Sequence, residues 1–133
     1  MKISIVMASY NYAPIIGEAI ESVINQTYKD WELIIVDDGS ADNSVEVIKK
    51  YLSDNRIKLY INEKNLGLAK TVRKGIQYST SDWIAFLESD DKFSPNALEE
   101  KVFGCIQEKL RVTLSWFTQD EKSKRYIICR TLK

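Results

Sequence analysis

Hydrophobic positions along the chain fall into two alternating patterns. Short apolar runs, often β-branched, are typical of buried strands, whereas apolar residues that recur every three or four positions predict amphipathic helices. The runs that predict strands are Ile3–Met7, Leu33–Val36, Ile57–Ile61 and Trp83–Leu87. The segments with helical spacing are 15–24, 45–52, 68–76 and 98–106. This order, in which each strand is followed by a helix, favours an α/β fold with a mostly parallel sheet and helices on both faces.

The pattern changes after residue 110. Val112–Thr118 and Tyr126–Cys129 predict two further strands on either side of a polar turn at 119–124. They are interpreted as a C-terminal strand pair, which forms either a hairpin or an added edge of the sheet. The chain is therefore expected to be one domain, with its α/β part at 1–110 and a partial extension at 111–133.

The order of the elements also predicts where a ligand would bind. A strand order of 3-2-1-4 places a switch point between the first and fourth strands, and ligands of such sheets bind beyond the carboxyl ends of the strands at that point. Three loops directly follow strands there, at Ala8–Asn11, Asp37–Ser40 and Glu88–Asp91. We expect them to lie close together although they are far apart in the sequence.

Composition narrows the possible functions. The 133 residues include 19 basic and 19 acidic ones, so the net charge is zero, which argues against a nucleic-acid partner. No apolar run approaches the ~20 residues that span a bilayer, and the first residues do not resemble a signal peptide, so the expected location is the cytoplasm. Cys105 and Cys129 are interpreted as thiols without a functional role.

The absence of histidine excludes catalytic triads that use it and histidine-ligated zinc. Any metal must then be held by oxygen atoms, which favours magnesium or manganese.

Acidic residues dominate two of the three loops. Glu88, Asp90 and Asp91 would repel one another unless a divalent cation joined them, although a solvated acidic turn explains the same residues. Asp38 could accept hydrogen bonds from a nucleobase or a ribose hydroxyl, or could simply belong to an Asx-type turn with Gly39.

Aromatic and basic residues add two weaker signals. Tyr10 could stack on a base, or it could pack locally within its loop. Lys70, Arg73 and Lys74 share one face of a predicted helix and could reach a phosphate together, or they could form a solvated basic face. Neither a G-x-G-x-x-G nor a G-x-x-x-x-G-K-[ST] motif is present, so a dinucleotide-binding dehydrogenase and a P-loop ATPase are disfavoured.

Five segments, in order and at suitable spacing, resemble a family 2 glycosyltransferase. These segments are SIVMASYN at 4–11, AIESVINQTY at 19–28, WELIIVDDGS at 31–40, NLGLA at 65–69 and WIAFLESDD at 83–91. The resemblance implies a GT-A fold, a nucleotide-sugar donor that is most often a UDP-sugar, a glycan acceptor, and a magnesium or manganese ion at a D-x-D-type motif. By position it implies donor-binding roles for Ala8, Ser9, Tyr10, Asn11, Asp38, Arg73, Glu88 and Asp90, and metal-binding roles for Asp90 and Asp91.

Several residues depart from the family pattern. Ala8 stands where relatives usually carry Thr or Pro, Glu88 replaces the first acid of the D-x-D motif, and Arg73 lies one register away from the usual Arg-Asn pair.

The chain is also shorter than family members with transferase activity. Since Asp120 and Glu121 fall in a predicted exposed turn, the catalytic base is expected to be absent from this chain. Two alternatives follow, an inactive nucleotide-sugar-binding domain or a half-domain that self-associates through Trp116 and Phe117 as a homo-oligomer. For a transferase, the location could also be the inner membrane face, where glycan acceptors lie.

Overall fold

A computed structural model describes residues 1–107, 125–127 and 131–132. Its main sheet has five strands in the order β3-β2-β1-β4-β6, and every neighbouring pair in it is parallel. These strands are β1 (Ile3–Ser9), β2 (Trp31–Asp37), β3 (Ile57–Ile61), β4 (Trp83–Phe86) and β6 (Arg125–Ile127). The predicted 3-2-1-4 order is therefore confirmed, with β6 added beside β4.

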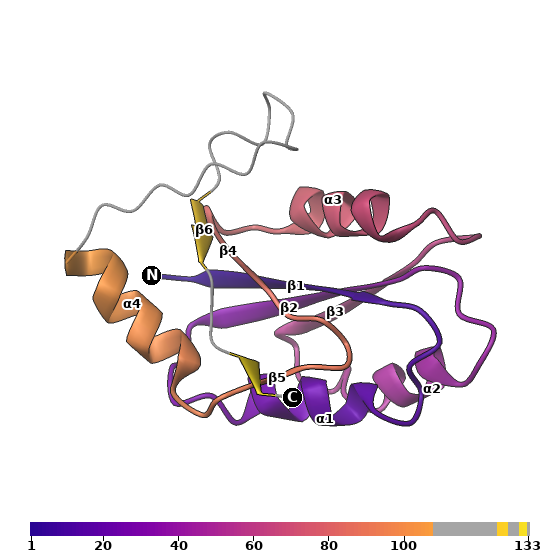
Figure 1. Cartoon of the computed structure of the whole chain (residues 1–133), viewed down its shortest axis with the longest axis horizontal. Helices are drawn as coiled ribbons and strands as arrows, with labels where there is room; N and C mark the ends of the chain where they lie inside the picture. Colours follow the sequence, from indigo (N-terminus) through magenta and orange to yellow (C-terminus); the bar gives the residue numbers. More distant parts are fainter. Residues whose placement is uncertain (108–124, 128–130, 133) are drawn as a thin grey trace.

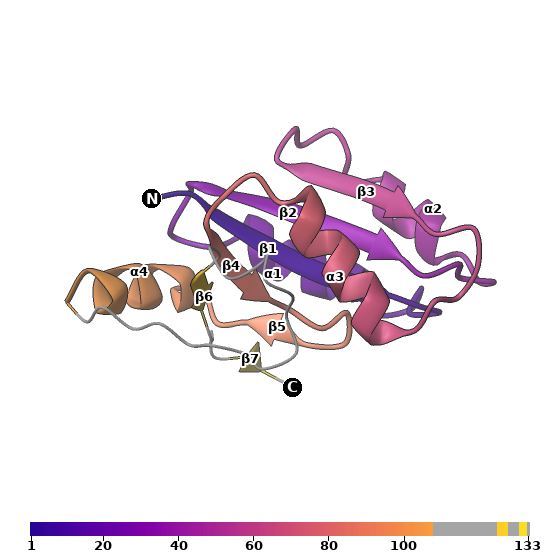
Figure 2. The ribbon, with the colours of Figure 1, turned by 90° about the horizontal axis from the view of Figure 1, so that it is seen from above.

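Helices cover both faces of this sheet, as predicted (Figure 1). The helices are α1 (Ile16–Ile24), α2 (Ser44–Lys49), α3 (Leu68–Tyr78) and α4 (Ala97–Gln107). Helix α3 lies along one face, whereas α1 and α2 lie on the other, and the view from above shows α3 crossing over the central strands (Figure 2). The mostly parallel α/β architecture expected from the sequence is thus the one observed.

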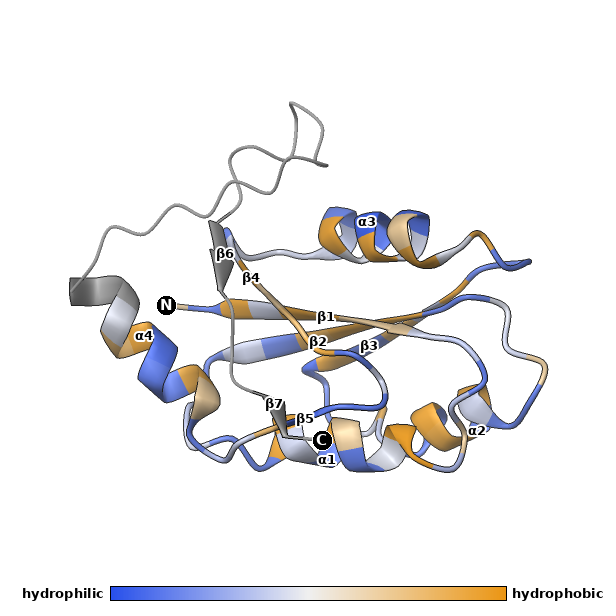
Figure 3. Ribbon diagram, viewed as in Figure 1, coloured by the Kyte–Doolittle hydropathy of each residue, from blue (hydrophilic) through white to orange (hydrophobic). Residues whose placement is uncertain are grey.

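The core is divided by the sheet because successive side chains of a strand point to opposite faces. Ile3, Ile5 and Met7 of β1 pack in the larger cluster with α1, whereas Val6 packs with Ile76 of α3 on the other face. The strands are apolar along most of their length, while the helices carry polar residues on their outer sides (Figure 3). This pattern matches strands that are buried on both faces.

Helix α3 lies unusually close to the sheet at Gly75. A Cβ atom built on Gly75 would lie 2.4 Å from Cγ1 of Val6, which is closer than any relaxed contact allows. The absence of a side chain at this position therefore determines how closely α3 approaches β1.

Glu32 is the most deeply buried acid of the α3 face and is 2% exposed. Its carboxylate accepts hydrogen bonds from the Ser4 hydroxyl (2.6 Å) and from both the amide (2.8 Å) and the hydroxyl (2.7 Å) of Thr80. Lys2 and Lys58 each lie 3.2 Å away. Burial alone would raise the pKa of Glu32, but the hydrogen bonds from Ser4, Thr80 and Lys58 outweigh it and lower the pKa from 4.5 to about 2.

The C-terminal strands differ from the predicted hairpin. Within the described residues, β6 is a parallel edge strand beside β4, and β7 (Thr131–Leu132) pairs antiparallel with β5 (Lys92–Phe93) in a separate two-stranded sheet. The added-edge alternative is therefore the one observed for β6. The predicted strand at 112–118 and the candidate surface at Trp116 and Phe117 lie outside the described residues.

Candidate functional site

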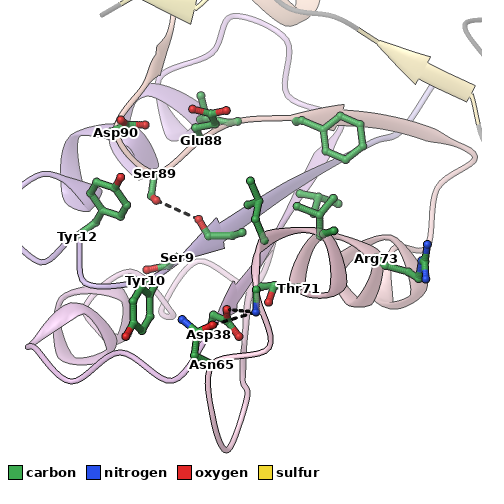
Figure 4. Close-up of a pocket in the computed structure, with 18 residues that line it drawn as sticks. Ser9, Tyr10, Tyr12, Asp38, Asn65, Thr71, Arg73, Glu88, Ser89 and Asp90 are labelled. Atoms are coloured by element: carbon green, nitrogen blue, oxygen red, sulfur yellow. Dashed lines mark hydrogen bonds between the residues drawn. The ribbon is translucent and has the colours of Figure 1, made fainter. Parts of the chain in front are cut away.

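A cavity of about 640 Å³ opens at the carboxyl ends of β1 and β4, beside the first turns of α3 (Figure 4). Residues from all three loops predicted to meet line this cavity. The predicted site residues among them are Ala8, Ser9, Tyr10, Asp38, Arg73, Glu88 and Asp90. Asn11 and Asp91 are not among the lining residues.

The end of β1 supplies one wall of the cavity. Tyr10 is 44% exposed, so its ring is available to a ligand. Ser9 is 1% exposed, and its hydroxyl has no hydrogen-bond partner among the described residues. Such a buried and unsatisfied hydroxyl is costly unless a ligand or water completes it. Tyr12 also lines the cavity, although sequence reasoning did not select it.

Asn11 connects two loops. Its backbone has a φ of 58°, a left-handed conformation that asparagine adopts more readily than most residues. The side-chain oxygen of Asn11 accepts a hydrogen bond from the backbone amide of Ala41 (2.8 Å). The backbone amide of Asn11 donates to the Ser40 hydroxyl (2.9 Å). Asn11 thus holds the loop after β1 against the loop after β2, and its predicted contact with the donor stays a prediction.

Asp38 lines the side of the cavity opposite the acidic cluster and is 4% exposed. One carboxylate oxygen accepts from the Asn62 amide group (2.9 Å) and the Leu66 backbone amide (2.7 Å), and the other accepts from the Gly67 amide (3.0 Å). Burial raises the pKa of Asp38, but hydrogen bonds from these residues and from Thr71 outweigh it, so the pKa is lowered. Asp38 is therefore a fixed anion at neutral pH.

Three acidic residues gather at the other side of the cavity mouth. One carboxylate oxygen from each of Glu88, Asp90 and Asp91 can lie within 4.8 Å of the others. The loop that carries them is anchored to β1, since the Ser89 hydroxyl donates to the Ala8 carbonyl (3.0 Å). Lys92, the next residue along the chain, is paired with Glu18 on α1 at 2.7 Å. No basic side chain among the described residues pairs with these three carboxylates, so they form a donor set that suits a hard divalent cation.

The three basic residues of α3 do not act as one group. The ammonium group of Lys74 donates to the side-chain oxygen of Asn62 (2.8 Å), while Lys70 is exposed and is not a lining residue. Arg73 lines the cavity, but Figure 4 shows its guanidinium group well away from Asp38 and Tyr10. Val72 lines the cavity as well, which makes this side of it apolar.

Sequence reasoning missed Thr71, Asn65 and Asn62. Thr71 and Asn65 line the cavity, and Asn62 lies behind Asp38. The motif around Asn65 and Gly67 was part of the family resemblance and could have indicated them. Asn62 had no such signal, because a lone asparagine after a strand is most often a turn residue.

The model of the family described as "Glycosyl transferase family 2" matches residues 4–127. The chain belongs to this family. Among curated relatives, it is 42% identical over 108 residues to the UDP-Glc:alpha-D-GlcNAc-diphosphoundecaprenol beta-1,3-glucosyltransferase WfgD of Escherichia coli, covering 81% of this chain and 42% of that protein. It is 35% identical over 108 residues to the glycosyltransferase GlyG of Streptococcus pneumoniae, covering 80% of this chain and 36% of that one.

Solved structures with the same fold include TarS of S. aureus in complex with UDP-GlcNAc, with a TM-score of 0.78, 24% identity, and coverage of 82% of this chain and 32% of that one. They also include the mannosyltransferase PcManGT from Pyrobaculum calidifontis in complex with GDP-Man and Mn²⁺, with a TM-score of 0.71, 19% identity, and coverage of 75% and 31%. At these identities the likeness shows the fold.

The chain spans less than half the length of the curated relatives it matches. In the part of the chain that the structure describes, no helix is both long and apolar enough to cross a membrane.

Proposed function

We propose that this chain is the donor-binding part of a glycosyltransferase that uses a UDP-sugar and a magnesium or manganese ion. One observation carries the proposal. A single cavity has a fixed carboxylate at one side, Asp38, and two members of the three-carboxylate cluster, Glu88 and Asp90, at the other, with the exposed Tyr10 ring at its wall. A nucleotide diphosphate presents a base with hydrogen-bond donors at one end and a charged diphosphate at the other, so it matches both sides.

The base end of the donor is assigned to Asp38 and Tyr10. A uracil ring presents an imino N–H group. The ionised carboxylate of Asp38 can accept a hydrogen bond from this group. Tyr10 offers an exposed ring face for stacking. Ser9 has a buried hydroxyl that lacks a partner among the described residues, and a ligand hydroxyl or carbonyl would complete it. The cavity volume of about 640 Å³ lies within the range of ordinary small-molecule sites.

The diphosphate end is assigned to Glu88, Asp90 and Asp91. These residues offer only oxygen ligands, and their oxygens come close enough together to share one cation. A divalent cation there would neutralise the negative charge that grows on the leaving nucleoside diphosphate. The same three acids form the candidate cation cluster of the sequence, in which the family resemblance implies metal-binding roles for Asp90 and Asp91.

The reaction we propose is inverting transfer to a glycan acceptor. An acceptor hydroxyl attacks the anomeric carbon, the bond to the diphosphate breaks, and a general base takes the hydroxyl proton. The residues of this chain bind and orient the donor for that attack, and we assign the role of the base to none of the described residues. The WfgD relative acts on a lipid-linked acceptor by its name, which supports a location at the cytoplasmic membrane face.

A second reading is a domain that binds nucleotide-sugar and transfers nothing. The observation that favours it is that the described residues provide both ends of a donor site, while none of them is assigned as the base that transfer needs. The two readings share the donor site and differ in turnover. Release of free UDP in the presence of a mixed glycan acceptor would support transfer, and its absence with intact UDP binding would support the binding domain.

Calorimetric titration of UDP into the chain, with and without manganese, tests the donor site itself. We expect binding that strengthens with manganese and loses this dependence in the Asp90→Ala variant. The matched control is Asp82→Ala, an exposed acid that does not line the cavity and should leave binding unchanged. No binding under either condition would refute the proposed function.

A further inference from the structure

We propose that Asn62, held in one orientation by Lys74, is the positioning residue that aims Asp38 at the imino N–H group of the bound base. Asn62 does not line the cavity, so it acts through Asp38 and not by touching the ligand. This inference rests on the proposed function, because it needs a nucleotide base at Asp38. It concerns a residue for which the sequence offered no signal.

The geometry forms a chain of three side chains from the surface to the cavity. Lys74 on α3 donates to Oδ1 of Asn62 at 2.8 Å. The Nδ2 group of Asn62 then donates to Oδ1 of Asp38 at 2.9 Å and to the hydroxyl of Thr71 at 3.2 Å. Asn62 is 5% exposed, and its backbone amide donates to the carbonyl of Asp37 at 2.8 Å, so water does not compete freely for these bonds.

Lys74 decides which way the Asn62 amide points. An ammonium group can only donate, so the oxygen of the amide must face Lys74 and its NH₂ group must face Asp38. In the flipped orientation, the amide oxygen would meet the Asp38 carboxylate and the NH₂ group would meet an ammonium. Both contacts would be repulsive, and the buried groups would lose their partners. The position of Lys74 therefore makes Asn62 a hydrogen-bond donor toward Asp38.

Asp38 can turn about its side-chain bonds unless its oxygens are held. The Leu66 amide and Asn62 hold one oxygen, and the Gly67 amide holds the other. A carboxylate has about four acceptor positions, and the Thr71 hydroxyl, which lines the cavity and also lowers the pKa of Asp38, stands at the position that these three bonds leave. A donor on the ligand would share or replace the Thr71 bond there. Without the Asn62 bond, Leu66 and Gly67 still hold one oxygen each, but the carboxylate can tilt about these two bonds, which misaligns the position that faces the ligand.

The test compares UDP with 3-methyl-UDP, which carries a methyl group in place of the imino hydrogen. Calorimetry with manganese present measures both affinities for the unaltered chain and for Lys74→Met, Asn62→Ala and Lys70→Met. Lys70 is the matched control, since it lies on the same helix, is exposed and does not line the cavity. Thermal unfolding of each variant shows whether it is folded, and Lys74→Met decides the question if Asn62→Ala does not fold.

We expect the unaltered chain to prefer UDP by about tenfold or more, as one hydrogen bond to a charged acceptor would give. Lys74→Met and Asn62→Ala should reduce this preference at least about threefold by weakening UDP binding, with 3-methyl-UDP binding changed less than about twofold. Lys70→Met should keep the full preference. The ratio is the decisive readout because a merely structural role would weaken both ligands equally.

Three other results are informative, and each would refute a different part of the proposal. If both variants lower the two affinities by the same factor, or change neither, Asn62 does not position Asp38, although the donor site stands. If the unaltered chain binds both nucleotides equally, Asp38 does not read the imino group, and the inference fails while nucleotide binding remains. If the unaltered chain binds neither nucleotide, the proposed function itself is refuted, and the role of Asn62 falls with it.

Discussion

The buried carboxylate of Glu32 makes the stability of this fold depend on pH in a predictable way. Its pKa is lowered to about 2 in the folded chain, against 4.5 for an unperturbed glutamate. A group with a depressed folded pKa stabilises the fold above its unfolded pKa, and this stabilisation is lost as the pH falls through the folded value. The window is therefore pH 5 to pH 2.

The size of the effect follows from the shift. At about 1.4 kcal/mol for each pKa unit, the full contribution of Glu32 is about 3 kcal/mol. Between pH 7 and pH 3 the expected loss is about 2 kcal/mol, and the rest is lost below pH 3. Glu32 is 2% exposed, so solvent screens its interactions little.

Urea unfolding followed by tryptophan fluorescence, at several pH values from 7 to 3, measures this loss. Other acids of the chain also contribute to acid destabilisation, so the comparison is with the Glu32→Gln variant. We expect the variant to be less stable at pH 7 and the difference to shrink by about 2 kcal/mol at pH 3. Glu46→Gln is the control, since Glu46 is an exposed acid that pairs with Lys49 at the surface, where such pairs contribute little.

Parallel curves for the unaltered chain and Glu32→Gln would refute the reasoning. They would mean that Glu32 binds protons equally in the folded and unfolded states. The hydrogen bonds from Ser4 and Thr80 would then not prefer the ionised form.

Three further predictions concern packing and the site. Gly75→Ala should destabilise the chain by about 1–3 kcal/mol in urea unfolding, because its Cβ would lie 2.4 Å from Val6, and Val6→Ala in the same chain should recover part of the loss. Asp38→Asn should weaken UDP binding about tenfold or more in calorimetry, since a neutral amide cannot accept from Leu66, Gly67 and a base as a carboxylate does. Asp90→Asn should remove the gain in UDP affinity that manganese provides, while binding measured in EDTA stays unchanged; an unaltered manganese effect would contradict the assignment of Asp90.

Local patterns in the sequence predicted most of the architecture. Strands β1, β2 and β4 were predictable because short apolar runs are typical of buried strands, and β3 because the alternating pattern of Ile57–Ile61 is typical of a partly exposed strand. The intervening helical periods leave few allowed connections. The strand ends were predicted less well. Leu33–Val36 is the centre of a longer strand, Trp31–Asp37, since Trp31 and Glu32 at its start are buried by partners far away in the sequence.

Residues 108–124 separate α4 from the edge strand Arg125–Ile127, and local pattern could not determine how that strand pairs. A short apolar stretch after a polar segment fits a hairpin and an edge equally well. The choice depends on the free edge of β4, which exists only once the sheet has formed.

The sequence by itself determined which residues of the site carry charge. It also determined that these residues lie directly after strands. Parallel topology then brings Asp38 and Glu88 to one edge of the sheet, so the meeting of these loops was predictable. Only the tertiary structure decided which side chains face the cavity and which serve as supports. Asn11 bonds to a neighbouring loop, Lys74 turns inward to Asn62, and Asn62 reaches Asp38. These contacts join positions 12 to 30 residues apart, and spacing along one chain does not encode the direction of a side chain in space.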